Sequence, residues 1–131
     1  MKQPVWLTKE IVAALHLGAI DEFGGNPGIR DDGLFESTLA HPRDLLGNGE
    51  PSLFELAAAY GFGLAKNHAF IDGNKRVAFS AIDVFLQLNG HELTADQVEA
   101  VVVIQDLAAG TLSEEDLAKW IGINSKKLPK P

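Results

Sequence analysis

The most chemically versatile part of the sequence is a nine-residue segment near the middle of the chain. It reads His68-Ala69-Phe70-Ile71-Asp72-Gly73-Asn74-Lys75-Arg76. The segment contains a base, a carboxylate, an amide and two cations, whereas a turn between two apolar stretches needs only one or two polar residues. These residue types together can bind a polyphosphate and remove a proton from a hydroxyl group, so we predict a phosphate-handling site here.

The second half of this segment is suited to binding phosphate. Gly73-Asn74-Lys75-Arg76 begins a predicted helix. The first turn of a helix presents backbone N–H groups that have no internal partner, at the positive end of the helix dipole. A glycine lets an anion approach the backbone closely, while Lys75 and Arg76 add full charges, and a guanidinium can contact two phosphate oxygens at once.

Asp72 and His68 supply the other two functions. A bare carboxylate at position 72 would repel phosphate, but it becomes useful if it holds Mg²⁺, which binds through one or two carboxylates together with substrate phosphates. An imidazole such as that of His68 is well suited to accept a proton from a hydroxyl near neutral pH. Each residue alone has an ordinary interpretation as a helix cap, a turn or a solvated charge. A hydrolytic metal site with His68 and Asp72 as ligands would lack a third and a fourth ligand.

Two apolar helices must hold this segment. Ser52-Leu53-Phe54-Glu55 is a capping box, and the helix that it predicts runs to about residue 67 or 68. A second helix is predicted from about Asn74 to Leu88, closed by Asn89-Gly90. Because both helices are apolar on nearly all sides, we expect them to lie buried at the centre of the fold.

Further helices are predicted on either side of this pair. Thr8 caps a helix that stops at Gly24-Gly25, before a loop rich in turn residues, and Asp32 caps a short helix that ends before Pro42. Two more helices are predicted over 94–109 and from residue 113 onward.

Strand signals are scarce. Gly47-Asn48-Gly49 predicts a tight turn, so we interpret Leu45 to Pro51 as an exposed flap that contains a short hairpin. Val5-Trp6-Leu7 is the other short strand signal. The predicted fold class is therefore mostly α, a helical bundle with two central buried helices and a short β-hairpin flap.

Composition limits the class of protein. The chain has 131 residues and a mass of 14.1 kDa, so we expect one domain over 1–131, with 126–131 as a frayed tail. With 46% apolar and 22% charged residues it has the balance of a soluble globular protein. No stretch is long and apolar enough to span a bilayer or to act as the core of a signal peptide, so we expect a cytoplasmic protein.

Cysteine and charge exclude other classes. The absence of cysteine rules out disulfides, thiolate metal sites and a catalytic thiol. A net charge of −7 argues against direct binding of nucleic acid, which depends on clustered Lys and Arg. The remaining polar candidates are weaker: His16 and His91 are expected to be structural or exposed, and His41 has no evident partner. Gly61-Phe62-Gly63 is better explained by close helix packing than by dinucleotide binding.

The nine-residue segment resembles the signature of the Fic/Doc family, H-x-F-x-[D/E]-G-N-[G/K]-R, at every fixed position. Similarity in the type and order of residues extends over nearly the whole chain. The resemblance implies that His68 is the general base, that Asp72 holds Mg²⁺, and that Gly73, Asn74, Lys75 and Arg76 bind the phosphates of ATP. It also implies that the flap from Leu45 to Pro51 aligns the target.

One position separates the branches of this family. Enzymes that transfer AMP carry glycine where this chain has Lys75, and they usually carry a second arginine where this chain has Phe79. Toxins of the death-on-curing (Doc) type share the lysine and transfer the terminal phosphate of ATP to a threonine of elongation factor Tu, which arrests translation. The resemblance therefore implies a kinase-like toxin of a type II toxin–antitoxin system, neutralised by an amphipathic C-terminal segment of its antitoxin.

Two positions depart from residues that are frequent in the family. Ala69 stands in place of a proline and Val77 in place of a threonine, and loss of the proline would loosen the loop.

Two alternatives stay open at the level of the sequence. One is an AMP-transferring enzyme of the Fic type, against which Lys75 and Phe79 argue. The other is a catalytically weak toxin that acts as an antitoxin-binding co-repressor, although a binding role alone would not require His68, Asp72 and the Lys75-Arg76 pair together.

Overall fold

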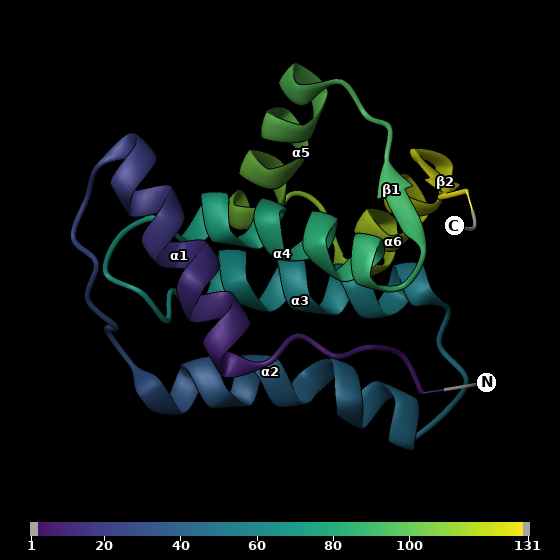
Figure 1. The fold of residues 1–131 in the computed structure, drawn as a ribbon, viewed down its shortest axis with the longest axis horizontal. Coiled ribbons are helices and arrows are strands. Elements are labelled where there is room, and N and C mark those ends of the chain that lie inside the picture. The colour runs from purple at the N-terminus through teal and green to yellow at the C-terminus, as the bar shows by residue number, and fades with distance from the viewer. Residues whose placement is uncertain (1–2, 130–131) are drawn as a thin grey trace.

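The computed structural model describes residues 3–129, which form a helical bundle with one small sheet (Figure 1). The helices are α1 (Lys9–Phe23), α2 (Asp32–Gly47), α3 (Leu53–Asn67), α4 (Asn74–Leu88), α5 (Gln97–Ala109) and α6 (Glu114–Ile123). The strands are β1 (His91–Leu93) and β2 (Ser125–Lys127). The predicted mostly helical fold class is confirmed.

Helices α3 and α4 lie at the centre, as their apolar sequences predict. In Figure 1 they run side by side, with α2 below α3 and α1 crossing over α4. Helix α6 packs on α3, and α5 packs on both central helices. From Leu56 to Ala65 every residue of α3 except Phe62 is buried, which leaves this helix with almost no face toward solvent.

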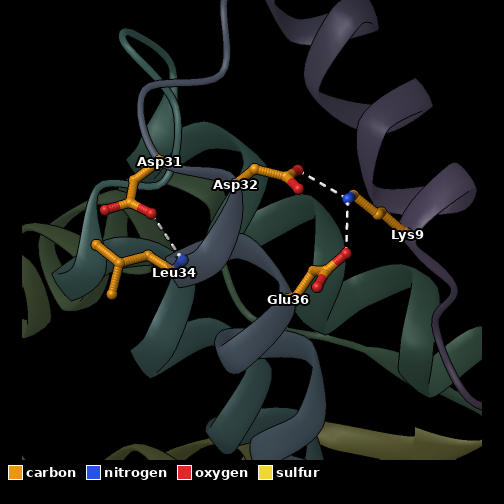
Figure 2. A network of polar contacts seen from close by, with 5 residues as sticks. All are labelled: Lys9, Asp31, Asp32, Leu34 and Glu36. Carbon is orange, nitrogen blue, oxygen red and sulfur yellow. Dashed lines mark hydrogen bonds and ion pairs between the residues drawn. The ribbon is translucent and has the colours of Figure 1, made fainter.

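Local capping signals fix where most helices begin. The Thr8 hydroxyl accepts the N–H of Ile11 at the start of α1, and the Ser52–Glu55 capping box is present at the start of α3. Helix α2 differs from the prediction by one position: Asp31 is the cap, and its carboxylate accepts the N–H of Leu34 (Figure 2).

Asp32, the first residue of α2, instead takes part in an ion pair between two helices. The Lys9 ammonium lies 2.7 Å from Asp32 and 3.1 Å from Glu36, so it joins the start of α1 to the first turns of α2 (Figure 2). Hydrogen bonds to these carboxylates raise the pKa of Lys9 above its ordinary value.

The predicted end of α2 and the predicted flap are both wrong. Helix α2 continues through the buried Pro42 to Gly47, and Leu45 packs against the core. Proline removes one backbone donor from the helix, but packing along α3 keeps the helix continuous beyond it. Only a short connection, 48–52, remains before α3, and it contains no strand.

The strands form elsewhere, between segments far apart in the sequence. Strand β1 pairs antiparallel with β2 in the register His91↔Lys127 to Leu93↔Ser125, and the Leu128 N–H bonds to the Gly90 carbonyl. The expectation of a frayed tail from residue 126 is thus wrong for Lys126 to Leu128, whereas residues 130–131 lie outside the described residues.

Within the described residues no strand forms at Val5-Trp6-Leu7, contrary to the strand signal there. The side-chain amide of Asn89 replaces a neighbouring strand, because it accepts the Val5 N–H and donates to the Val5 carbonyl. Tyr60 anchors the same segment from the core: its hydroxyl accepts the Leu7 N–H, and burial raises the pKa of this phenol. Between residues 3 and 129 no helix combines the length and apolar composition that a membrane crossing requires.

The glycines of α3 serve close helix packing, as the sequence suggested. A Cβ atom on Gly61 would overlap the Ile82 side chain of α4, and one on Gly63 would lie 2.6 Å from Thr38 of α2. Both contacts are shorter than van der Waals distance, so the small residues are what allows three helices to pack this closely.

We predict that Gly61→Ala lowers the free energy of unfolding by about 1–3 kcal/mol, because the added methyl group overpacks the contact with Ile82. Gly18→Ala is the matched control: Gly18 lies in α1 with no atom near its missing Cβ, and there the substitution should stabilise by about 0.5–1 kcal/mol. Urea unfolding of both variants measures the difference. Equal stability of Gly61→Ala and the unsubstituted protein would contradict the proposed packing.

Candidate functional site

The candidate segment forms the loop between α3 and α4, which we call the motif loop (His68 to Gly73). It lies at the end of the molecule opposite to the small sheet (Figure 1). The connection between α1 and α2 (24–31) runs beside it. The two segments pair through an antiparallel bridge between Ile29 and Phe70 and a hydrogen bond of 3.0 Å from the Ile71 N–H to the Gly28 carbonyl. A loop rich in turn residues therefore acts as a partner strand for the motif loop.

His68 ends α3 in a left-handed conformation, with φ 51° and ψ 51°. It is the one residue other than glycine with positive φ among residues 3–129. Arg30 holds this strained position, because its Nε donates to the His68 carbonyl (2.5 Å) and its Nη2 donates to the Asn67 carbonyl (2.9 Å). The guanidinium thus satisfies the last carbonyls of α3, which no helical N–H can reach. The His68 imidazole is left exposed, without a hydrogen bond inside the described chain.

Asp72 is exposed, and only one of its two carboxylate oxygens accepts a hydrogen bond from residues 3–129. Its Oδ2 accepts the Asn26 N–H at 2.8 Å, and its Cβ lies so near Gly25 that a side chain there would be crowded. The second carboxylate oxygen has no partner among residues 3–129. No group of three or more potential metal ligands is present in the same part of the chain. A cation at Asp72 would therefore need the remaining ligands from phosphate and water, which fits Mg²⁺ and does not fit a protein-made zinc site.

The start of α4 has the features of an anion site. Gly73 precedes the helix in a left-handed conformation (φ 80°), and no side chain caps the helix. The first helical hydrogen bond joins the Val77 N–H to the Gly73 carbonyl, so the N–H groups of Asn74, Lys75 and Arg76 have no partner among the described residues. No acidic residue occupies the first turn, so nothing there competes with a bound anion.

The two cations of the motif are exposed and make no ion pair within residues 3–129. The Arg76 guanidinium stacks over the Phe23 ring at the end of α1, 3.5 Å from its centroid. This contact holds the planar group beside the helix start, where its N–H donors can reach a phosphate.

Asn74 has a role that the sequence did not reveal. Its side chain is 7% exposed and forms two hydrogen bonds with the backbone of Phe70: its Nδ2 donates to the Phe70 carbonyl (2.9 Å), and its Oδ1 accepts the Phe70 N–H (3.1 Å). The amide therefore closes the motif loop onto α4. Only the backbone N–H of Asn74 is left to contact phosphate, so its predicted binding role is confined to the main chain.

The segment predicted as a target-aligning flap does not lie at the site. Leu45 to Pro51 precedes the N-terminal end of α3, whereas the motif loop follows its C-terminal end (Figure 1). The 15 residues of α3 separate these ends by about 22 Å. The connection 24–31 occupies the place beside the motif loop instead.

Three neighbours of the motif loop were missed by sequence reasoning: Arg30, Asn26 and His16. The turn signal at 24–28 predicted a loop but gave no sign of which segment it would pair with. His41, expected to lack partners, lies 3.2 Å from both carboxylate oxygens of Glu114, so that expectation is wrong. His68, Asp72, Lys75 and Arg76 are exposed at the motif loop and the start of α4, and Gly73 is partly exposed.

Comparisons with known proteins show which family the chain is similar to. The family model described as Fic/DOC family matches residues 6–86. A protein named Toxin Doc from Mycolicibacterium smegmatis is 43% identical over 76 residues, which cover 56% of this chain and 58% of that relative. A protein named Protein kinase doc from Escherichia phage P1 is 32% identical over 113 residues, 86% of this chain and 89% of that relative.

We predict that Asn74→Ala lowers the free energy of unfolding by about 1–3 kcal/mol, because it leaves the buried N–H and carbonyl of Phe70 without partners. Lys75→Ala is the control on the same turn. The Lys75 side chain is exposed, so its removal should change the free energy of unfolding by less than about 0.5 kcal/mol. Thermal and urea unfolding compare the two, and a loss of stability no larger in Asn74→Ala than in Lys75→Ala would contradict the assignment.

Proposed function

The chain belongs to the Fic/Doc family as a toxin of the Doc type, and we propose that it transfers the terminal phosphate of ATP to a hydroxyl group of a protein target. The observation that carries this proposal is that the motif loop joins two exposed groups with different chemistry. The imidazole of His68 lies at the beginning of the loop, and the uncapped start of α4, with Lys75 and Arg76, follows its end. Asp72 lies between them.

The start of α4 would bind the phosphates of ATP. The N–H groups of residues 74–76 need acceptors, and phosphate oxygens meet that need at the positive end of the helix. Lys75 and Arg76 add two positive charges in a protein whose net charge is −7. This local reversal of charge favours a polyanion at this helix start over the rest of the surface.

Asp72 would hold Mg²⁺ through the carboxylate oxygen that has no protein partner, while Asn26 fixes the other oxygen. The ion would neutralise charge on the phosphates during transfer. Because residues 3–129 form no group of three or more potential metal ligands, this proposal predicts that the ion binds together with ATP and not before it.

His68 would act as the general base. As the target hydroxyl oxygen bonds to the terminal phosphorus, the imidazole takes the hydroxyl proton, and the bond from that phosphorus to the bridging oxygen of ADP breaks. Arg30 holds the left-handed backbone at His68, and the residue is exposed, so a target hydroxyl can reach its imidazole. ADP then leaves with the electron pair of the broken bond.

Transfer of phosphate is favoured over transfer of AMP. Phe79 is partly buried against the core, so the position at which AMP-transferring relatives usually carry a second arginine offers no charge. Lys75 would crowd the helix start where those enzymes bind the inner phosphates. The name Protein kinase doc of the phage P1 relative supports the same choice.

The proposed target is a threonine of elongation factor Tu, and its modification would arrest translation in the cytoplasm. The proposed regulator is an antitoxin whose C-terminal amphipathic segment covers the toxin. Helix α5 offers a surface for such a segment: its exposed side includes Val98, Val101 and Val102, which are 71, 56 and 50% exposed. An apolar helix face of this kind is what an amphipathic partner helix binds.

We predict that the protein, incubated with bacterial lysate, Mg²⁺ and labelled ATP, transfers label from the γ phosphate to a single protein of the size of elongation factor Tu. His68→Ala should reduce the rate by about 10²–10⁴-fold and leave the melting temperature nearly unchanged, because the side chain is exposed. Parallel reactions with ATP labelled at the α or the γ phosphate are the measurement. Transfer of the α label would replace the proposal by AMP transfer, and absence of both labels would favour a binding module that acts with its antitoxin.

We also predict that Asp72→Asn raises the Mg²⁺ concentration needed for half-maximal transfer by about tenfold or more. The asparagine can still accept the Asn26 N–H, so the loop is retained while the charge is lost. Glu50→Gln removes an exposed carboxylate at the other end of α3 and should change nothing. Titration of the transfer rate with Mg²⁺ measures this, and identical titration curves for Asp72→Asn and Glu50→Gln would contradict the role of Asp72.

A further inference from the structure

A buried histidine outside the motif contacts three residues of the motif loop. His16 lies on α1 and is 1% exposed. Its ring stacks on the Phe70 ring with a centroid separation of 3.7 Å and an interplanar angle of 11°. Its Nε2 lies 2.7 Å from the Asp72 carbonyl oxygen, and its edge faces Gly73 so closely that a Cβ there would lie 3.4 Å from the ring.

The contact with Asp72 fixes the protonation of the ring nitrogen. A carbonyl oxygen can only accept a hydrogen bond, so Nε2 of His16 must carry the proton and donate it. Phe70 is itself fixed, because Asn74 holds its backbone and its ring also contacts Phe35, with ring centroids 4.9 Å apart. His16 is therefore locked in place by packing and aims its N–H at one backbone atom.

That backbone atom controls the direction of a neighbouring donor. The peptide bond between Asp72 and Gly73 is planar and trans, so its carbonyl and the Gly73 N–H point in opposite directions. Because His16 holds the carbonyl toward the interior, the Gly73 N–H points away from α1. No residue of the described chain accepts this N–H, which directly precedes the free N–H groups of residues 74–76.

We propose that His16 is a positioning residue: its hydrogen bond to the Asp72 carbonyl turns the Gly73 N–H outward, so that four successive backbone donors, 73–76, face the same phosphate. The inference rests on the proposed binding of ATP at the start of α4. The same hydrogen bond also fixes the backbone at Asp72, from which the carboxylate side chain extends. Without it, the left-handed Gly73 could rotate its peptide unit at little cost, because glycine populates both signs of φ.

Two substitutions separate positioning from simple filling of space. His16→Gln keeps a donor near the place of Nε2, whereas His16→Leu keeps a buried side chain of similar volume but has no donor. Both lose the stacked ring, so both should lower stability. Only the loss of the donor should release the Asp72–Gly73 peptide unit.

The experiment measures binding of Mg·ATP by isothermal titration calorimetry in the His68→Ala background, so that no phosphate is transferred during the titration. We expect His16→Leu to weaken binding by about tenfold, the scale of one lost hydrogen bond, and His16→Gln to restore most of the affinity. Gly61→Ala controls for stability alone, because it is destabilised within the α3–α4 contact and should bind Mg·ATP like the parent. Nitrogen-15 NMR of the unsubstituted protein should show the His16 proton on Nε2.

The outcomes distinguish this inference from the proposed function. The parent for these measurements is the His68→Ala protein. If it binds Mg·ATP and His16→Leu in the same background binds Mg·ATP equally well, the positioning role of His16 is overturned while the proposed ATP site stands. A His16 proton found on Nδ1 alone would overturn it as well. If the parent binds no Mg·ATP, the proposed function fails and the role of His16 fails with it.

Discussion

The motif loop has its shape because another loop hydrogen-bonds to it. The Ala69 carbonyl accepts the N–H groups of both Arg30 and Asp31, at 2.7 and 3.1 Å, and the Gly28 carbonyl accepts the Ile71 N–H. These bonds run between segments about forty residues apart, and they bring with them the guanidinium of Arg30 and the N–H of Asn26. A short loop between two helices would otherwise leave several buried backbone groups without partners. The site thus depends on the connection between α1 and α2 as much as on its own sequence.

The local features of the fold could be predicted from the sequence, and the long-range ones could not. The capping residues Thr8 and Ser52 and the apolar runs of α3 and α4 are encoded within a few residues, so the helices that they define were predicted closely. The continuation of α2 through Pro42 results from packing along α3, which overrides the local preference against proline. Pairing of β1 with β2 joins segments more than thirty residues apart, and the sequence pattern of three-residue strands is too weak to predict this pairing.

For the site, the sequence predicted which residues gather but not how they divide their tasks. His68, Asp72, Lys75 and Arg76 are exposed around the loop, whereas Phe70 and Asn74 are buried beneath it. The buried pair explains why the signature is long: an aromatic ring and a side-chain amide must fix the loop before the exposed groups can act in one place. A buried amide and a phosphate-binding amide look alike in a sequence, so the role of the Asn74 side chain became visible only from its hydrogen bonds to Phe70.

The departure at Ala69 can be judged from the same hydrogen bonds. Proline at this position fixes φ through its ring, and alanine gives up that constraint. Ala69 is nevertheless buried, and its carbonyl is fixed by two backbone donors from the neighbouring connection, so the conformation is determined from outside the residue. The strained φ of His68 directly before it is held in the same way by Arg30. Since these contacts constrain the backbone on both sides of the 68–69 peptide bond, the alanine should affect how readily the loop forms more than the geometry that it reaches.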